Sequence, residues 1–194
     1  LTQNGHTQDY MRYKITFKDR PNEANFYRII VDKQMRLWGY NHEEGGEDYL
    51  HWTKHITYSF IGREDIVLTD GQPSTGDDED NGLFDTAKNI YGVFDDSRFR
   101  DTSYTMTVYN DPAIPYNNNY NGYYEGMDVI IRLLSITETE YYYLKALNLV
   151  DSDVYDETIN EPLRYPSNVH GGTGMVSIST EVSQTVRIRE NTPE

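Results

Sequence analysis

The feature that most constrains the fold is a long period-two pattern near the C-terminal end of the sequence. From Val176 to Ile188 every second residue is Val, Ile, Thr, Val, Gln, Val and Ile, and the residues between them are Ser, Ser, Glu, Ser, Thr and Arg. The register holds over 13 residues, whereas a typical strand has about 5–6. A strand of this length with one apolar face is typical of a curved sheet or barrel rather than a flat sheet.

Shorter stretches of the same kind occur earlier in the chain. In "YKITFK", Tyr13, Ile15 and Phe17 share one face. The segment "FYRIIV", after the turn "DRPNEAN", is apolar on both faces, which predicts a strand that is covered on both sides. Three more strands are predicted at His55–Phe60, Tyr104–Tyr109 and Val129–Ser135.

One segment has a helical pattern instead. The stretch "TETEYYYLKALNLV" begins at Thr137 and carries Glu140 three residues later, which is a capping-box signature. Apolar residues then recur at helical spacing and form a stripe wide enough to pack on a sheet. The stripe consists of Tyr141, Leu144 and Asn148 on one line and Tyr143, Leu147 and Val150 on the next.

These patterns predict a mainly β fold, an antiparallel β-barrel or curved β-sandwich with long loops and one packed α-helix. The chain has 194 residues, which suits a single β-rich domain over residues 1–194. The predicted loops are Asn41–Asp48, Asp70–Asn81 and Asn110–Gly126. Loops of such length in a compact domain are usually functional or mobile.

Composition excludes several classes of protein. A net charge of −15 argues against nucleic acid and against an anionic membrane surface, because both require a basic footprint. The chain has no Cys, which excludes disulfides, zinc–thiolate sites and thiol nucleophiles. No apolar run approaches the roughly 18 residues of a membrane helix. The 18 tyrosines can bury ring area while keeping a hydroxyl for a partner.

Two segments contain candidate metal ligands. His51 and His55 have the spacing of a helical metal pair, but their context predicts a strand, in which four residues span about 13 Å. The second segment is the acidic Asp70–Asn81 loop, whose end resembles the start of the calcium-binding loop of an EF-hand. Lys88 occupies the position at which such a loop has its bidentate Glu. We therefore predict no metal site. The residues that would hold a calcium ion are Asp77, Glu79 and Asn81.

The sequence carries no recognisable catalytic constellation. It lacks the G-x-S-x-G elbow of serine hydrolases, and "GGTG" is not followed by the Lys and Ser or Thr of a phosphate-binding loop. We predict that the protein is not an enzyme and uses no cofactor. The rival prediction is a glycan- or peptide-acting hydrolase, which needs two carboxylates across a cleft. The pair considered is Asp95 or Asp96 with Glu125.

Two other segments could carry function. The Asn110–Gly126 loop is rich in Tyr and Asn, which supply rigid aromatic area and adaptable hydrogen bonds at low entropic cost. Its candidate ligand- or partner-binding residues are Tyr116, Tyr120, Tyr123 and Tyr124. The segment "YPSNVHGGTGMVSISTEV" has three glycines, Gly171, Gly172 and Gly174, just before the longest predicted strand. We interpret them as structural, since glycine permits positive φ or a bulge there, and His170 has no acid or nucleophile near it in sequence.

Four segments together resemble one family. They are "YKITFKDRPNEANFYRIIV", "NGLFDTAKNIYGVFDDSRFRDTSYTMTVY", "VIIRLLSITETEYYYLKAL" and "EPLRYPSNVHGGTGMVSIS", and their order and spacing match the Bacteroidetes lipoprotein family of domain of unknown function 4249. Met175 departs from the family pattern, which usually has an aromatic residue after the glycines.

The resemblance implies a cellular context. Family members are secreted lipoproteins with a lipidated N-terminal Cys and an immunoglobulin-like region, so this chain would be the C-terminal part of a longer protein. They are often encoded near TonB-dependent outer-membrane transporters. The expected function is therefore a non-enzymatic accessory or binding subunit for nutrient uptake, surface-exposed at the outer membrane. It would bind a transporter or its associated lipoproteins, or an oligosaccharide or peptide. A purely structural scaffold or lid is a further alternative.

Overall fold

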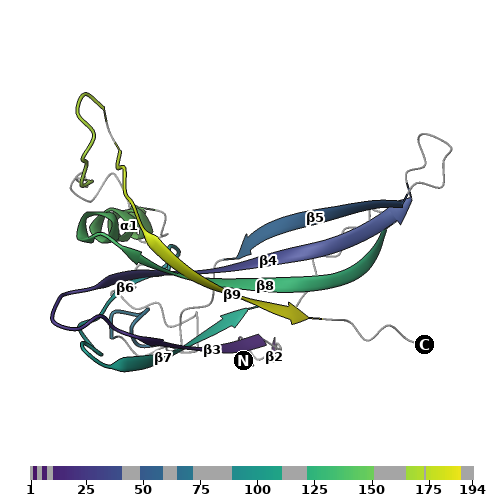
Figure 1. The fold of residues 1–194 in the computed structure, drawn as a ribbon, viewed down its shortest axis with the longest axis horizontal. Helices are drawn as coiled ribbons and strands as arrows, with labels where there is room; N and C mark the ends of the chain where they lie inside the picture. Colours follow the sequence, from purple (N-terminus) through teal and green to yellow (C-terminus); the bar gives the residue numbers. More distant parts are fainter. Residues whose placement is uncertain are drawn as a thin grey trace.

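A computed structural model describes residues 2–3, 6–7, 11–40, 49–58, 65–71, 89–110, 122–150, 165–172 and 174–188. Within these ranges the protein is mainly β, with antiparallel sheets and one helix. Two short strands, β1 (Thr2–Gln3) and β2 (His6–Thr7), pair only with each other in the described part of the chain. The remaining strands form two sheets that face one another (Figure 1).

The larger sheet is built around two long central strands. Its members are β4 (Phe26–Tyr40), β5 (Tyr49–Tyr58), β6 (Val93–Asp95), β8 (Gly122–Ile136) and β9 (Thr180–Ile188). The strand order is β5-β4-β8-β9, and β6 pairs with the beginning of β4. One edge of β4 is therefore divided between β6 and β5, while β8 runs along the whole of the other edge.

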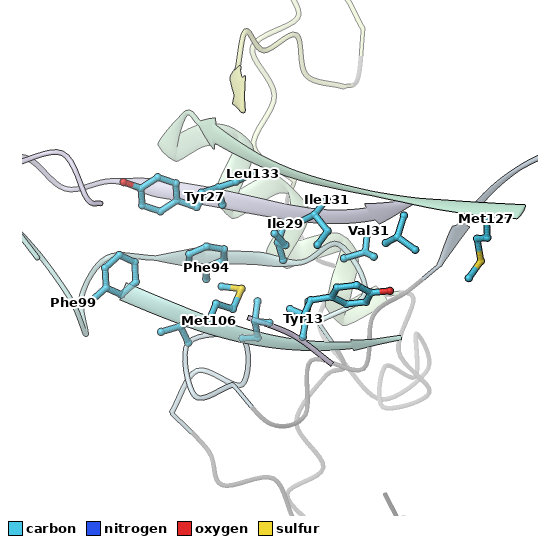
Figure 2. Packing of buried hydrophobic residues seen from close by; sticks show 14 residues of the cluster. Tyr13, Tyr27, Ile29, Val31, Phe94, Phe99, Met106, Met127, Ile131 and Leu133 are labelled. Atoms are coloured by element: carbon cyan, nitrogen blue, oxygen red, sulfur yellow. The ribbon is translucent and has the colours of Figure 1, made fainter. Parts of the chain in front are cut away.

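The smaller sheet is a two-stranded ribbon of β3 (Met11–Lys18) and β7 (Ser103–Asn110). It covers one face of the larger sheet, and the main core fills the space between them (Figure 2). Alternation explains the arrangement, because every second residue of each strand points into this layer. The central strands contribute Tyr27, Ile29, Val31, Met127, Val129, Ile131 and Leu133, and the ribbon contributes Tyr13, Met106 and Val108.

Aromatic rings close one end of the core. Phe17 on β3 is surrounded by the rings of Tyr27, Phe94, Phe99 and Tyr104, with centroid distances of 5.5–6.2 Å. Pairs of this kind contribute about 0.5–1.5 kcal/mol beyond the burial of their area. This end of the sandwich is therefore apolar, and the preferred geometry of its ring pairs helps to fix how they pack.

The opposite face of the larger sheet is covered in part by α1 (Glu138–Val150). As predicted, the helix buries Tyr141, Leu144 and Asn148. Tyr141 and Leu144 pack in a second cluster with Val93 and Ile136. The predicted N-cap is also confirmed, since the Thr137 hydroxyl accepts a 3.2 Å hydrogen bond from the Glu140 amide.

Buried carboxylates fasten the connecting segments to the sandwich. Asp19 accepts hydrogen bonds from the Tyr27 hydroxyl (2.6 Å) and from the Asp101 amide (2.9 Å). Asp96 accepts from the backbone amide of Asn25 (2.8 Å) and from the guanidinium of Arg100 (3.0 Å). Where the backbone turns, amide groups have no partner on a neighbouring strand, and each carboxylate supplies the hydrogen-bond acceptor instead.

Asp65 is a buried carboxylate that supplies hydrogen-bond acceptors to the edge of the ribbon. Its Oδ2 accepts a 2.7 Å hydrogen bond from the Thr107 amide on β7, and its Oδ1 accepts a 2.8 Å bond from the Tyr104 hydroxyl. Since β3 pairs along the other edge of β7, the Asp65 turn caps the edge that β3 leaves open. Asp65 is itself buried, at 6% exposure.

The fold prediction is confirmed as a curved sandwich rather than a barrel. Apart from the separate β1–β2 pair, the strands that the structure describes form two sheets that do not close on each other. Several boundaries differ from the prediction: β4 extends to Tyr40 and β5 begins at Tyr49, both beyond the predicted strands. Residues from Val176 to Ser179 precede β9 without strand pairing, so the last strand is shorter than the alternating pattern. In contrast, β8 begins at Gly122, so the end of the predicted Asn110–Gly126 loop belongs to a strand.

Candidate partner-binding surface

The described residues 165–172 and 174–179 form an arm that leads into β9. In Figure 1 this segment, coloured yellow-green, rises away from the sandwich beside α1 before the chain enters β9. We call residues 165–179 the C-terminal arm. Most of its described residues are exposed, in contrast to the strands of the sandwich.

Side-chain hydrogen bonds give the arm a defined shape. The Asn168 amide group pairs with the backbone of Val176 in both directions, donating to its carbonyl at 2.7 Å and accepting from its N–H at 2.8 Å. The Ser167 hydroxyl donates to the carbonyl of Gly174 at 2.7 Å. The carboxamide of Asn168 thus acts as a short piece of backbone and holds the two sides of the arm together.

Two glycines allow the chain to reverse at the tip of the arm. Gly171 has φ of 81° and Gly174 has φ of 132°, which are values that residues with a Cβ rarely adopt. The predicted structural role is therefore confirmed for these two positions. His170 lies exposed in the same turn.

Both ends of the arm are attached to α1. The Tyr165 ring lies 6.0 Å from the ring of Tyr143. The Ser177 hydroxyl donates to the carboxylate of Glu140 and lies 3.3 Å from the hydroxyl of Thr137. The helix cap therefore also fixes the position at which the arm returns to the sheet.

Apolar side chains are exposed along the arm and its continuation. Val169 is 37% exposed, Val176 72% and Ile178 86%, and Val182 on β9 is 68% exposed. Burying one such side chain contributes about 1.5–3 kcal/mol. Apolar side chains that gather on an ordered surface are typical of a site that binds another macromolecule.

A charged cluster holds α1 in place under this surface. Lys145 Nζ contacts Asp70 Oδ1 at 2.7 Å, and the Tyr141 hydroxyl donates to Asp95 Oδ2 at 3.1 Å. Burial raises the pKa of Tyr141 to about 12. Burial opposes the charge of Lys145, but its hydrogen bonds and electrostatic contacts with Asp70 and Tyr141 together outweigh burial, and the pKa of Lys145 is raised. The phenol and the ammonium therefore keep their protons, as suits a structural contact.

The pKa of Asp95 is likewise set by burial and by opposing hydrogen bonds. Burial acts to raise it, but hydrogen bonds from Ser97 and from the Tyr141 hydroxyl stabilise the carboxylate and leave the pKa lowered. The Ser97 amide donates to Asp95 Oδ1 at 2.9 Å. Asp95 is thus an ionised acceptor held by its neighbours.

The structure does not bring the proposed hydrolase carboxylates together. Asp95 pairs with Phe26 at the beginning of β4, whereas Glu125 lies in β8 at the bulge opposite Arg36 and Leu37. Ten residues of β4 separate these positions, which corresponds to about 33 Å along a strand. Catalytic carboxylates of glycosidases lie about 5–10 Å apart. In addition, Asp96 is 1% exposed, so a hydrolase site built from these residues is wrong.

The tyrosines predicted to bind a partner fall in two different places. Tyr116 and Tyr120 lie outside the described residues. Tyr123 and Tyr124 lie in β8, where their backbones pair with Trp38 and Leu37, and their side chains are outside the described part. A binding role for these four residues stays a prediction.

The metal candidates are placed only in part. Asp77, Glu79 and Asn81 lie outside the described residues. His51 and His55 lie in β5, which confirms the predicted strand. Within the described ranges, no group of three or more His, Asp or Glu could hold a metal ion. No helix in the same ranges has the length and hydropathy needed to cross a membrane.

Sequence reasoning missed the most exposed residues of the surface. Val176 and Ile178 continue the alternation of Val182 and Val186, so the pattern predicted that they face a core. The structure leaves Val176 and Ile178 uncovered. The Ser and Gly residues around them indicate only that the strand pattern weakens before β9.

The described residues form an antiparallel β-sandwich with an ordered arm that exposes apolar side chains. Residues 1–185 match the family described as "Domain of unknown function (DUF4249)", and the chain belongs to this family. Comparisons of the chain with curated proteins and with solved structures gave no match.

Proposed function

We propose that this protein is a non-enzymatic binding module of a surface-exposed outer-membrane lipoprotein, an accessory subunit of a TonB-dependent transporter system for nutrient uptake. The observation that carries the proposal is the exposure of Val176 and Ile178 on an arm of defined shape. The arm would insert these side chains into an apolar groove of the partner, for which we propose the transporter.

The order of the arm supports binding rather than a passive surface. Ser177 and Tyr165 attach it to α1, and Asn168 fixes its two sides. A segment that is already ordered loses less conformational entropy when a partner covers it. The arm therefore presents its apolar side chains at a lower entropic cost than a disordered loop would.

The chemistry of the described residues also favours binding over catalysis. The titratable groups beside the arm, Tyr141, Asp95 and Lys145, are engaged with one another or with Asp70. The net charge of −15 serves solubility and the steering of association. Recognition of an oligosaccharide or peptide nutrient would use the tyrosines of the 110–126 segment, as a second contact of the same accessory protein.

The test is a pull-down of the native protein from outer membranes in mild detergent, followed by mass spectrometry. The double variant Val176→Asp/Ile178→Asp is expected to lose a stoichiometric transporter that the wild type retains. The matched control is Ile66→Asp, because Ile66 is also an exposed isoleucine (47%) and belongs to the 65–71 turn. A wild-type protein that is isolated alone would overturn the proposal, as would an arm variant that retains the transporter.

A second variant separates the two contacts. Replacing Tyr116, Tyr120, Tyr123 and Tyr124 by Ala is expected to abolish nutrient binding while the transporter still co-purifies through the arm. Binding of oligosaccharides and peptides would be followed by calorimetry. If both transporter and nutrient binding are untouched in this variant, the four tyrosines have no role.

A further inference from the structure

Among the residues that the structure describes, no strand pairs with the outer edge of β9. Within the described strands β9 pairs only with β8, through a ladder of nine residue pairs without a register shift. Residues 180–185 are all exposed, on both faces of the sheet. A strand in this position presents unpaired backbone N–H and C=O groups to solvent.

This edge lacks the devices that usually prevent strands from pairing. The sequence of β9, "TEVSQTVRI", contains no Pro, Gly or Lys, and its ladder with β8 has no bulge. The edge of β7 provides the contrast, because Asp65 accepts the hydrogen bond of the Thr107 amide there. The described residues provide no such acceptor for β9.

We propose that β9 pairs antiparallel with β9 of a second copy of this chain, about a two-fold axis at Gln184. This is the register in which all nine residues of Thr180–Ile188 find a partner within the strand. Glu181 then lies opposite Arg187 of the second copy, and Arg187 opposite its Glu181. The two larger sheets become one continuous sheet.

Charge and hydrophobicity both select this register. The ends of the paired strands carry opposite charges, and opposite charges directly across a strand pair are favourable. On the core-facing side, Val182 of one copy meets Val186 of the other. Val182 is 68% exposed in the single chain, whereas Val186 is already packed against the core. Pairing would thus extend the core across the two-fold axis and cover the exposed valine.

The absence of cysteine makes this register directly measurable. Residues opposite each other in antiparallel strands have Cα atoms about 4.5–5.5 Å apart, which is within disulfide range. Gln184 lies opposite itself, so Gln184→Cys is expected to give a disulfide-linked dimer under mild oxidation. The chain has 0 cysteines, so the introduced thiol is the only one.

The neighbouring positions supply matched controls. Ser183 lies opposite Thr185 of the second copy, so each lies about two residues, or roughly 7 Å along the strand, from its own equivalent. Ser183→Cys and Thr185→Cys are therefore expected to form no disulfide-linked dimer alone and to crosslink when mixed. All three positions are exposed on the same strand. Equal crosslinking of the three single variants, or no gain on mixing, would overturn the register.

Association without a covalent bond is measured by sedimentation of the full chain at increasing concentration. The experiment is best done at about 0.15 M salt, where the Debye length of about 8 Å screens the repulsion between two acidic chains. Val182→Lys is expected to weaken association by roughly tenfold or more, because it places a charge against the partner's Val186. The control Ile66→Lys is expected to have no effect. A wild-type chain that is monomeric at all concentrations, with no Gln184→Cys dimer, would overturn the proposal.

Discussion

β8 and β9 are adjacent strands with similar sequence patterns and opposite environments. On β8, Met127, Val129 and Leu133 alternate with outward-facing residues and are 0–8% exposed. On β9, Val182 pairs directly with Leu133 and points to the same face, yet it is 68% exposed. The difference is that β8 has a neighbour on both edges and the ribbon over its inner face, whereas β9 is at the edge.

This comparison shows which information an alternating pattern contains. Alternation predicts that a segment is extended and which residues share a face. It does not tell whether another layer covers that face, because coverage depends on residues far away in the chain. Here the covering ribbon consists of β3 and β7, which lie under β4 and β8 and leave the beginning of β9 uncovered.

The largest difference is expected between the two members of one cross-strand pair. Leu133→Ala removes a side chain that is 8% exposed and should lower the free energy of unfolding by about 2–5 kcal/mol. Val182→Ala removes its exposed partner and, at protein concentrations where the chain is monomeric, should change it by less than about 0.5 kcal/mol. Urea denaturation of both variants measures these changes in the free energy of unfolding. Equal losses would mean that β9 is covered in solution.

A smaller difference is expected between two side chains that each accept a backbone hydrogen bond. Asp96 accepts from the Asn25 amide at 2.8 Å and is 1% exposed. Asp96→Ala leaves a buried donor unpaired and should cost about 1–3 kcal/mol. Asn168 accepts from the Val176 amide at 2.8 Å, but in the exposed arm.

Because water can replace the lost bond in the arm, Asn168→Ala should leave global stability unchanged. Its effect should appear as faster hydrogen exchange at the Val176 amide. Denaturation together with exchange measured by mass spectrometry distinguishes the two sites. A global loss from Asn168→Ala would show that the arm is part of the cooperative core.

The smallest effect is expected in the alkaline pH dependence of adjacent tyrosines on α1. Burial raises the pKa of Tyr141 from 10.0 to about 12, so the fold favours the neutral phenol. The resulting stability is fully present below pH 10 and is lost as the pH rises from 10 towards 12. Tyr141→Phe should therefore reduce the loss of stability over this range.

Tyr142, which is 51% exposed, provides the control for this measurement. Tyr142→Phe should leave the alkaline loss unchanged. Thermal unfolding of the wild type and both variants at pH 8 to 12 gives the comparison. If Tyr141→Phe kept the wild-type pH profile, the buried phenol would not be the titrating group.

Local signals in the sequence located the helix and parts of the main strands, but not β1, β2 or β6. Alternation identified the strands and their faces, and the Thr137 cap and the stripe of Tyr141, Leu144 and Asn148 identified the helix and its buried side. These features depend on neighbours within about four residues along the chain. For the same reason Gly171 and Gly174 could be assigned a structural role that permits positive φ.

The pairing of the strands and the exposure of the candidate surface were decided only by the tertiary structure. No local pattern predicts that β6 and β5 divide one edge of β4, or that Asp65 caps β7 at Thr107. Likewise, the sequence of the arm resembles a strand that faces a core, but the arm lies outside the sheet, before β9 begins, and Val176 and Ile178 are exposed there (Figure 1). The sequence determined which side chains share a face, because that depends on backbone periodicity. The packing of distant segments decided which faces stay open to a partner.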